Sequence, residues 1–136
     1  MTPPIKIIIK LIEDNIGDII AIQDLLRGNG LYELECFVEP GPFLASINSD
    51  IDLVITDLRI DNYNALETIR DIHDTYPGIR IIVISAAFTP LIYEQLIWYR
   101  VDGVVKKDGA YWTDRLMEWL DHLAPNIIER KKLIAS

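Results

Sequence analysis

Five polar residues stand at the ends of apolar runs that are typical of buried strands. Glu13 and Asp14 come directly after the first run, and Asp57 ends a later one. Ser85 ends another run, and Lys107 follows the last. Open parallel α/β sheets bind ligands in the crevice outside the carboxyl ends of their strands. We therefore expect these side chains to meet at one edge of a sheet.

The elements that position them alternate regularly along the chain. We expect strands over residues 5–12, 34–38, 51–56, 79–85 and 103–105, and helices over residues 15–26, 42–48, 64–76, 90–99 and 109–123. Strands that are apolar on both faces imply a parallel sheet covered by helices on both sides, with right-handed crossovers. The predicted fold class is α/β: a doubly wound, flavodoxin-like, five-stranded parallel sheet in the order 2-1-3-4-5.

The first helix shows how local signals support this assignment. Asn15 is a suitable N-cap, and Gly28 or Gly30 can end the helix in the left-handed conformation. We expect the side of this helix that carries its apolar residues to face the sheet. They are Ile16, Ile19, Ile20, Ile22 and Leu26.

The first and third strands are neighbours in this order, so Glu13, Asp14 and Asp57 should converge. Carboxylates about 4 Å apart repel by roughly 4 kcal/mol per pair at an effective dielectric near 20. A hard cation neutralises such a group, and Mg²⁺ suits a few carboxylates plus waters. Acids, a metal, the Ser85 hydroxyl and the Lys107 ammonium together match phosphoryl transfer, with Asp57 as the candidate nucleophile.

Four segments carry a resemblance to a known family. They are IIKLIEDN around the acidic pair, LVITDL around Asp57, IIVISA ending near Ser85, and DGVVKKDG with Lys107. Over residues 5–123, the chain resembles a response-regulator receiver domain of two-component signalling. The resemblance implies a cytoplasmic signalling domain, not an enzyme, whose Asp57 accepts a phosphoryl group from a histidine kinase or phosphotransfer protein.

The resemblance also assigns a role to each site residue. It implies that Mg²⁺ binds Glu13, Asp14, Asp57 and the backbone carbonyl of Arg59. Ser85 takes the position of the switch hydroxyl and Lys107 that of the phosphate-binding lysine. Phosphorylation would then alter the face formed by residues 90–99, 103–105 and 109–123, through which the domain would form a homodimer or contact an effector.

Some positions depart from the family pattern. Asp61 and Ala65 replace a usual Pro and Gly after the acceptor, and Val104 replaces the aromatic switch residue. Asp108 replaces a Pro that follows the lysine through a cis bond; a non-proline cis bond costs about 2.5 to 4 kcal/mol, so we predict a trans Lys107–Asp108 bond. These departures motivate an alternative, a pseudo-receiver that acts as a phosphorylation-independent interaction module.

Enzymes of the same topology fit less well. A flavin binder needs a loop that cradles phosphate after the first strand, but residues 14–18 are too acidic for that role. A phosphatase with a paired-Asp motif needs an acid where Arg59 stands.

Length and charge limit the remaining possibilities. The 136 residues make one globular domain, which we place at residues 1–124, with residues 125–136 as a helical extension or the start of a linker. A net charge of −8 argues against direct binding to nucleic acid or an anionic membrane. The sequence has neither a signal peptide pattern nor an apolar stretch long enough to span a bilayer.

Aromatic residues gather toward the C-terminal part of the chain. Trp98, Tyr111, Trp112 and Trp119 all lie on or beside the last two expected helices. Trp and Tyr are enriched in the cores of interfaces, so these residues indicate either a partner surface or packing between the two helices. Their exposure distinguishes these possibilities.

Overall fold

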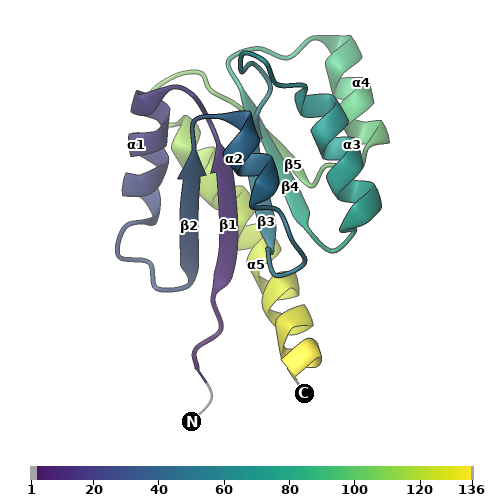
Figure 1. The fold of residues 1–136 in the computed structure, drawn as a ribbon. Coiled ribbons are helices and arrows are strands. Elements are labelled where there is room, and N and C mark those ends of the chain that lie inside the picture. Colours follow the sequence, from purple (N-terminus) through teal and green to yellow (C-terminus); the bar gives the residue numbers. More distant parts are fainter. Residues whose placement is uncertain (1–2, 136) are drawn as a thin grey trace.

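Five parallel strands form one sheet, and five helices alternate with them along the chain (Figure 1). The computed structural model describes residues 3–135. The strands are β1 (Ile7–Ile12), β2 (Tyr32–Phe37), β3 (Leu53–Asp57), β4 (Arg80–Ser85) and β5 (Gly103–Lys106). The helices are α1 (Ile16–Leu26), α2 (Pro40–Ala45), α3 (Ala65–Thr75), α4 (Pro90–Trp98) and α5 (Trp112–Ala135). The strand order is β2-β1-β3-β4-β5, which confirms the predicted fold class.

Two apolar cores lie on opposite faces of the sheet, because alternate residues of each strand point to opposite sides. On one face, Ile9 and Ile55 pack with residues of α1 and α5. On the other, Val54 and Val83 pack with residues of α2, α3 and α4. Burial on both faces fixes the register of the central strands. The residues at the strand ends therefore have defined positions.

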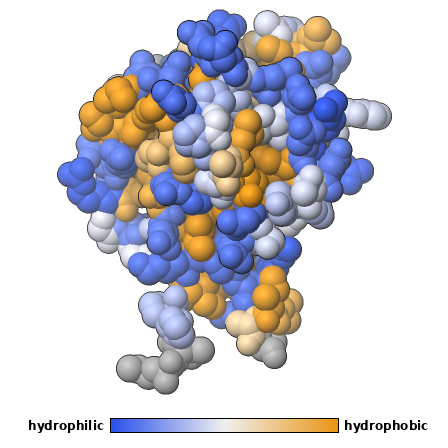
Figure 2. Space-filling model, viewed as in Figure 1, coloured by the Kyte–Doolittle hydropathy of each residue, from blue (hydrophilic) through white to orange (hydrophobic). Residues whose placement is uncertain are grey.

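Helix α1 differs from the expectation for its apolar side. The Asn15 side chain caps the helix by accepting a hydrogen bond from the Asp18 backbone N–H at 3.0 Å, as expected. Ile19, Ile22 and Leu26 are buried, but Ile16 and Ile20 are exposed. The prediction that all five apolar residues face the sheet was therefore wrong for two of them. Figure 2 shows the resulting apolar surface over α1.

Helix α5 is longer than expected and continues through Pro125 to Ala135. Ala124 and Ile127, on either side of this proline, are buried in the core formed with α1. Packing of these residues supports the helix across the position where proline removes a backbone hydrogen bond. The last turns of α5 extend past the sheet (Figure 1).

The four aromatic residues divide into two pairs. Trp98 and Tyr111 are 82% and 73% exposed. Trp112 is buried, and Trp119 packs against the core on the α5 side of the sheet. Two of the four aromatic residues therefore pack in or against the core, and the other two lie on the surface.

Two further expectations concern the backbone and the membrane. The peptide bonds of the described residues are all trans, which confirms the trans Lys107–Asp108 bond. Within residues 3–135, no helix has the length and apolar character needed to cross a bilayer.

Candidate functional site

The predicted site residues line one cavity at the carboxyl edge of the sheet. Its volume is about 350 Å³. The walls are formed by the segments that follow β1, β3, β4 and β5, and by the start of α1. The predicted residues that line it are Glu13, Asp14, Asp57, Arg59, Ser85 and Lys107. The structure thus brings together every residue named for the site from the sequence.

Lys107 lies at the centre of this arrangement. Its Nζ donates to Glu13 Oε2 at 2.8 Å, to Asp18 Oδ2 at 2.8 Å and to Asp57 Oδ2 at 2.5 Å. The Lys107 backbone N–H donates to the Ser85 carbonyl at 2.7 Å, which ties the residue to the end of β4. Burial by itself lowers the pKa of the ammonium, but the hydrogen bonds to the three carboxylates outweigh this effect and raise the pKa above its usual range.

Glu13 is completely buried between Lys107 and the beginning of α1. Its Oε1 accepts a hydrogen bond from the Asn15 backbone N–H at 3.0 Å, while Oε2 faces Lys107. Burial raises the pKa of Glu13 to about 7, and the neighbouring Asp57 adds to this effect. The hydrogen bonds from Lys107 and Asn15 oppose the shift only in part. Glu13 is therefore poised to lose its proton near neutral pH.

Asp57 is nearly buried, and each of its two carboxylate oxygens has a different partner. Oδ1 accepts a hydrogen bond from the Arg59 backbone N–H at 2.8 Å, and Oδ2 accepts one from Lys107. The Arg59 side chain is exposed at the rim of the cavity. This carboxylate is held in place and still borders an open cavity, as a nucleophile requires.

Ser85 is buried at the end of β4. Its hydroxyl donates to the Ala87 carbonyl at 2.9 Å and also lies 3.4 Å from the Ala87 backbone nitrogen as an acceptor. The side chain is thus engaged with the loop between β4 and α4. To donate to another partner, the hydroxyl would have to leave the Ala87 carbonyl.

The carboxylate oxygens at this site are suitable ligands for a hard cation, although the Lys107 ammonium already bonds those of Glu13 and Asp57. Asp14 is exposed, and its carboxylate makes no hydrogen bond or ion pair within residues 3–135. Carboxylate and carbonyl oxygens are the ligands that Mg²⁺ prefers. No cluster of three or more acidic, His or Cys side chains in the described chain is already arranged around a cation position. The carboxyl groups of Glu13, Asp14 and Asp57 are of the chemical type that binds Mg²⁺. The Lys107 ammonium holds two of them, those of Glu13 and Asp57.

Two residues of the site were missed from the sequence. Asp18 pairs with Lys107 from the first turn of α1, where an acid also interacts favourably with the helix dipole. Arg115 of α5 donates to the Lys106 carbonyl at 2.6 Å and to Asp108 Oδ1 at 2.5 Å, which holds the loop that carries Lys107. Local spacing gives no signal for either long-range contact.

Comparisons with known proteins identify the fold. No protein-family model and no curated protein sequence matches the chain. A CheY-like response regulator receiver domain protein from Methanospirillum hungatei JF-1 is 20% identical, with a TM-score of 0.76 over 93% of this chain and 98% of its own. The signal receiver domain of an HD domain-containing protein from Pseudomonas fluorescens Pf-5 is 18% identical, with a TM-score of 0.76 over 91% and 98%.

A third neighbour is the isolated REC domain of RcsB from Salmonella enterica serovar Typhimurium, whose structure was obtained with the phosphomimetic BeF₃⁻. It is 22% identical, with a TM-score of 0.69 over 77% of this chain and 80% of its own. The first two neighbours share their fold with more than nine tenths of this chain, and the third with 77% of it. The chain therefore has the fold of the response-regulator receiver domains of two-component systems.

Proposed function

We propose that this chain is a receiver that accepts a phosphoryl group on Asp57. The observation that carries the proposal is the position of Lys107, whose ammonium bonds the buried carboxylates of Glu13 and Asp57 from neighbouring strands. The cavity beside Asp57 gives a donor access to this carboxylate. The resemblance in sequence and the likeness in fold both support this function.

In this proposal, an Asp57 oxygen attacks the phosphorus of a phosphohistidine, the P–N bond breaks and a P–O bond forms. Charge on the transferred group must be balanced in the transition state. The Lys107 ammonium would pair with one oxygen of the phosphoryl group. The Ser85 hydroxyl would donate to a second phosphoryl oxygen after leaving the Ala87 carbonyl. The domain catalyses only its own phosphorylation and dephosphorylation.

Mg²⁺ is the implied cofactor. Glu13, Asp14, Asp57 and the Arg59 carbonyl would hold it, and the ion would supply positive charge beside the phosphoryl oxygens. The Asp14 carboxylate has no partner among the described residues and is open to such an ion. Lys107 would have to release part of its hold on Glu13 and Asp57, because an ammonium and a metal ion compete for the same oxygens.

The proposed partners follow from the same assignment. A histidine kinase or phosphotransfer protein would supply the phosphoryl group in the cytoplasm, and the α4-β5-α5 face would contact an effector or a second copy. Trp98 and Tyr111 leave exposed aromatic surface at this face. We propose residues 1–124 as the receiver domain and residues 125–136 as an extension or the start of a linker, whose first turn packs on the domain through Ile127.

A pseudo-receiver is the second candidate, and one observation favours it. The Lys107 ammonium already has three carboxyl partners, Glu13, Asp18 and Asp57, so this lysine needs no phosphate to be paired. In that case, the fold would serve binding alone.

Intact-mass spectrometry distinguishes the two candidates. The protein is incubated with a small-molecule phosphodonor, with and without Mg²⁺, beside an Asp57→Asn variant. The receiver function predicts one phosphoryl adduct that requires both Mg²⁺ and Asp57. No adduct on a folded protein that also fails to bind Mg²⁺ leaves the pseudo-receiver.

A further inference from the structure

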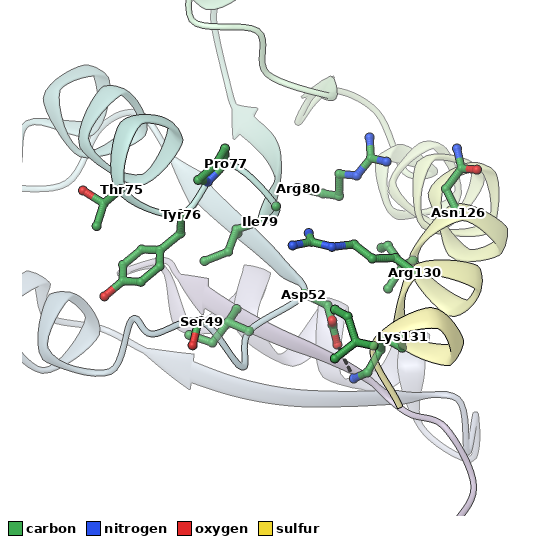
Figure 3. A pocket seen from close by; sticks show the side chains of 14 residues that line it. Ser49, Asp52, Thr75, Tyr76, Pro77, Ile79, Arg80, Asn126, Arg130 and Lys131 are labelled. Carbon is green, nitrogen blue, oxygen red and sulfur yellow. Dashed lines mark hydrogen bonds and ion pairs between the residues drawn. The ribbon is translucent and has the colours of Figure 1, made fainter. Parts of the chain in front are cut away.

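A second cavity lies at the amino ends of the strands, opposite the carboxyl-edge site. Its volume is about 280 Å³, and it is enclosed by the end of α3, the start of β4 and the last turns of α5 (Figure 3). A smaller cavity of about 190 Å³ adjoins it and shares the turn at Pro77, Gly78 and Ile79, together with Arg80 and Arg130. We call the two together the amino-edge cleft.

The amino-edge cleft is cationic in a chain of net charge −8. Four of its lining residues are basic, namely Arg80, Arg100, Arg130 and Lys131. The carboxylates that line it are already paired. Asp52 Oδ2 bonds Lys131 at 2.7 Å, and Asp102 Oδ1 bonds Arg80 at 3.0 Å. The uncompensated charge therefore belongs to the other two arginines.

Arg100 and Arg130 have no carboxylate partner within residues 3–135. Both arginines line the smaller cavity, where His73 and Asp102 are further polar neighbours. A guanidinium presents several donors in a planar fork that matches the oxygens of phosphate. The Asp102 carboxylate that also lines this cavity bonds Arg80, so it does not neutralise Arg100 or Arg130. Two arginines at one cavity are suited to a doubly charged oxyanion.

The position of Arg130 depends on a glycine. In Figure 3 its side chain extends from α5 toward the turn at Pro77 and Ile79. A methyl group built on Gly78 would lie 1.7 Å from Arg130 Nη1. A side chain at position 78 would thus displace the guanidinium without changing its charge.

The larger cavity offers an apolar wall beside this cationic hollow. Ile51, Ile79 and Ile127 line it and are buried, and the Tyr76 ring lies across from Arg130 (Figure 3). Ligand cavities commonly combine such an apolar lining with a few polar groups that fix orientation. The cleft therefore has one compartment for an anion and one for an apolar body.

We propose that the amino-edge cleft binds a small phosphate monoester with an aromatic body. The phosphate lies between Arg100 and Arg130. The aromatic group lies against Tyr76 and Ile127. This site is separate from the carboxyl-edge cavity and does not depend on phosphorylation of Asp57.

Amide chemical shifts test the proposal. Phenyl phosphate is titrated into the whole chain in EDTA, which keeps Mg²⁺ out of the carboxyl-edge site, and inorganic phosphate and phenol are titrated separately. We expect saturable shifts at the amides of Gly78, Ile79 and Arg80, with phenyl phosphate binding more tightly than either fragment. Shifts confined to residues around Asp57, or no saturable shifts, would overturn the proposal.

Three variants test which groups carry the binding. Arg130→Gln removes the charge, Gly78→Ala displaces the guanidinium, and Arg27→Gln removes an exposed arginine elsewhere as the matched control. A charge-assisted hydrogen bond contributes about 1.5 to 3 kcal/mol, so Arg130→Gln should weaken binding at least about tenfold. Gly78→Ala should weaken it in the same direction, and Arg27→Gln should not. Equal affinity in Arg130→Gln and the unaltered chain would also overturn the proposal.

Discussion

At the scale of single residues, one ammonium bonds three carboxyl groups at the carboxyl edge. Glu13 and Asp57 are almost without solvent, so their charges depend on Lys107. Removing one partner from a buried ion pair leaves an uncompensated charge, which is more costly than the pair itself. This ion pairing leads to one prediction for Lys107 and one for Glu13.

The first prediction concerns Lys107→Met in metal-free protein. It should lower the free energy of unfolding by about 3 kcal/mol or more, because Glu13 and Asp57 lose their common cation. Lys106→Met, which alters the exposed neighbouring lysine, is the matched control. It should change the free energy of unfolding by less than about 0.5 kcal/mol. Urea unfolding measures both.

The same unfolding experiment can be repeated with added Mg²⁺. The ion should stabilise Lys107→Met more than the unaltered protein, because the ammonium no longer competes for the carboxylates. An equal increase in the free energy of unfolding of both proteins would show that Mg²⁺ does not bind these carboxylate oxygens.

The second prediction concerns pH and Glu13. Burial raises the pKa of this carboxyl from 4.5 to about 7 in the folded protein. Between these values the folded state binds more protons than the unfolded state, so this group's contribution to the free energy of unfolding falls as pH rises. In EDTA, the decline should be steeper in the unaltered protein than in Glu13→Gln. Glu118→Gln, which removes an exposed acid, should keep the original slope.

At the scale of elements, the packing of α5 on β5 supports the strand that precedes Lys107. Gly103 leaves room for the Trp119 ring, since an added Cβ would lie 2.6 Å from Cδ2 of that ring. Close packing of helix and strand therefore depends on the absence of a side chain at this position.

The third prediction tests that packing. Gly103→Ala should destabilise the fold by about 1 to 3 kcal/mol, as other overpacked core positions do. Gly41→Ala is the control, because an added methyl group there meets nothing within 4 Å and alanine favours a helix. Denaturant unfolding of the two variants should give changes of opposite sign. Unchanged stability in Gly103→Ala would show that Trp119 moves aside freely.

The elements also show what the sequence could predict. β-branched runs identified the central strands, and the parallel order then placed Glu13, Asp57, Ser85 and Lys107 at one edge. The trans peptide after Lys107 followed from the absence of proline. These features depend on local chemistry that repeats along the chain.

Other features depend on tertiary contacts that have no local signal. The set of five apolar residues in α1 is too wide for one face, and burial falls on Ile19 and Ile22, leaving Ile16 and Ile20 exposed. The expected helix over residues 109–123 stopped before Pro125, but α5 continues past this proline, with Ile127 buried in the core. Tertiary packing overrides propensity in such cases.

At the scale of the whole molecule, charge and apolar surface are unevenly distributed. The cavity with Asp57 is acidic, the amino-edge cleft is basic, and α4 presents Leu91, Ile97 and Trp98 to solvent. Exposed aromatic and aliphatic side chains together are typical of interaction surfaces. The α4-β5-α5 face is therefore the place where we expect a second copy or an effector.

The fourth prediction tests that face. Protein loaded with beryllofluoride and Mg²⁺, as a phosphoryl mimic, should form dimers with increasing concentration in sedimentation experiments. Trp98→Ala should weaken the dimer at least about tenfold, because a central Trp commonly contributes 2 kcal/mol or more. Leu44→Ala, which trims an exposed apolar residue on α2, is the control. A monomer at every concentration would exclude self-association through this surface.

The position of the covalent bond to phosphorus tests the assignment of Asp57 as the acceptor most directly. Phosphorylated protein is reduced with borohydride, which converts an acyl phosphate on aspartate to homoserine, and the peptides are sequenced by mass spectrometry. We predict homoserine at position 57 alone, and none when Mg²⁺ is withheld. Phosphate on Ser85, on a histidine or on another carboxylate would contradict the assignment of Asp57 as the acceptor.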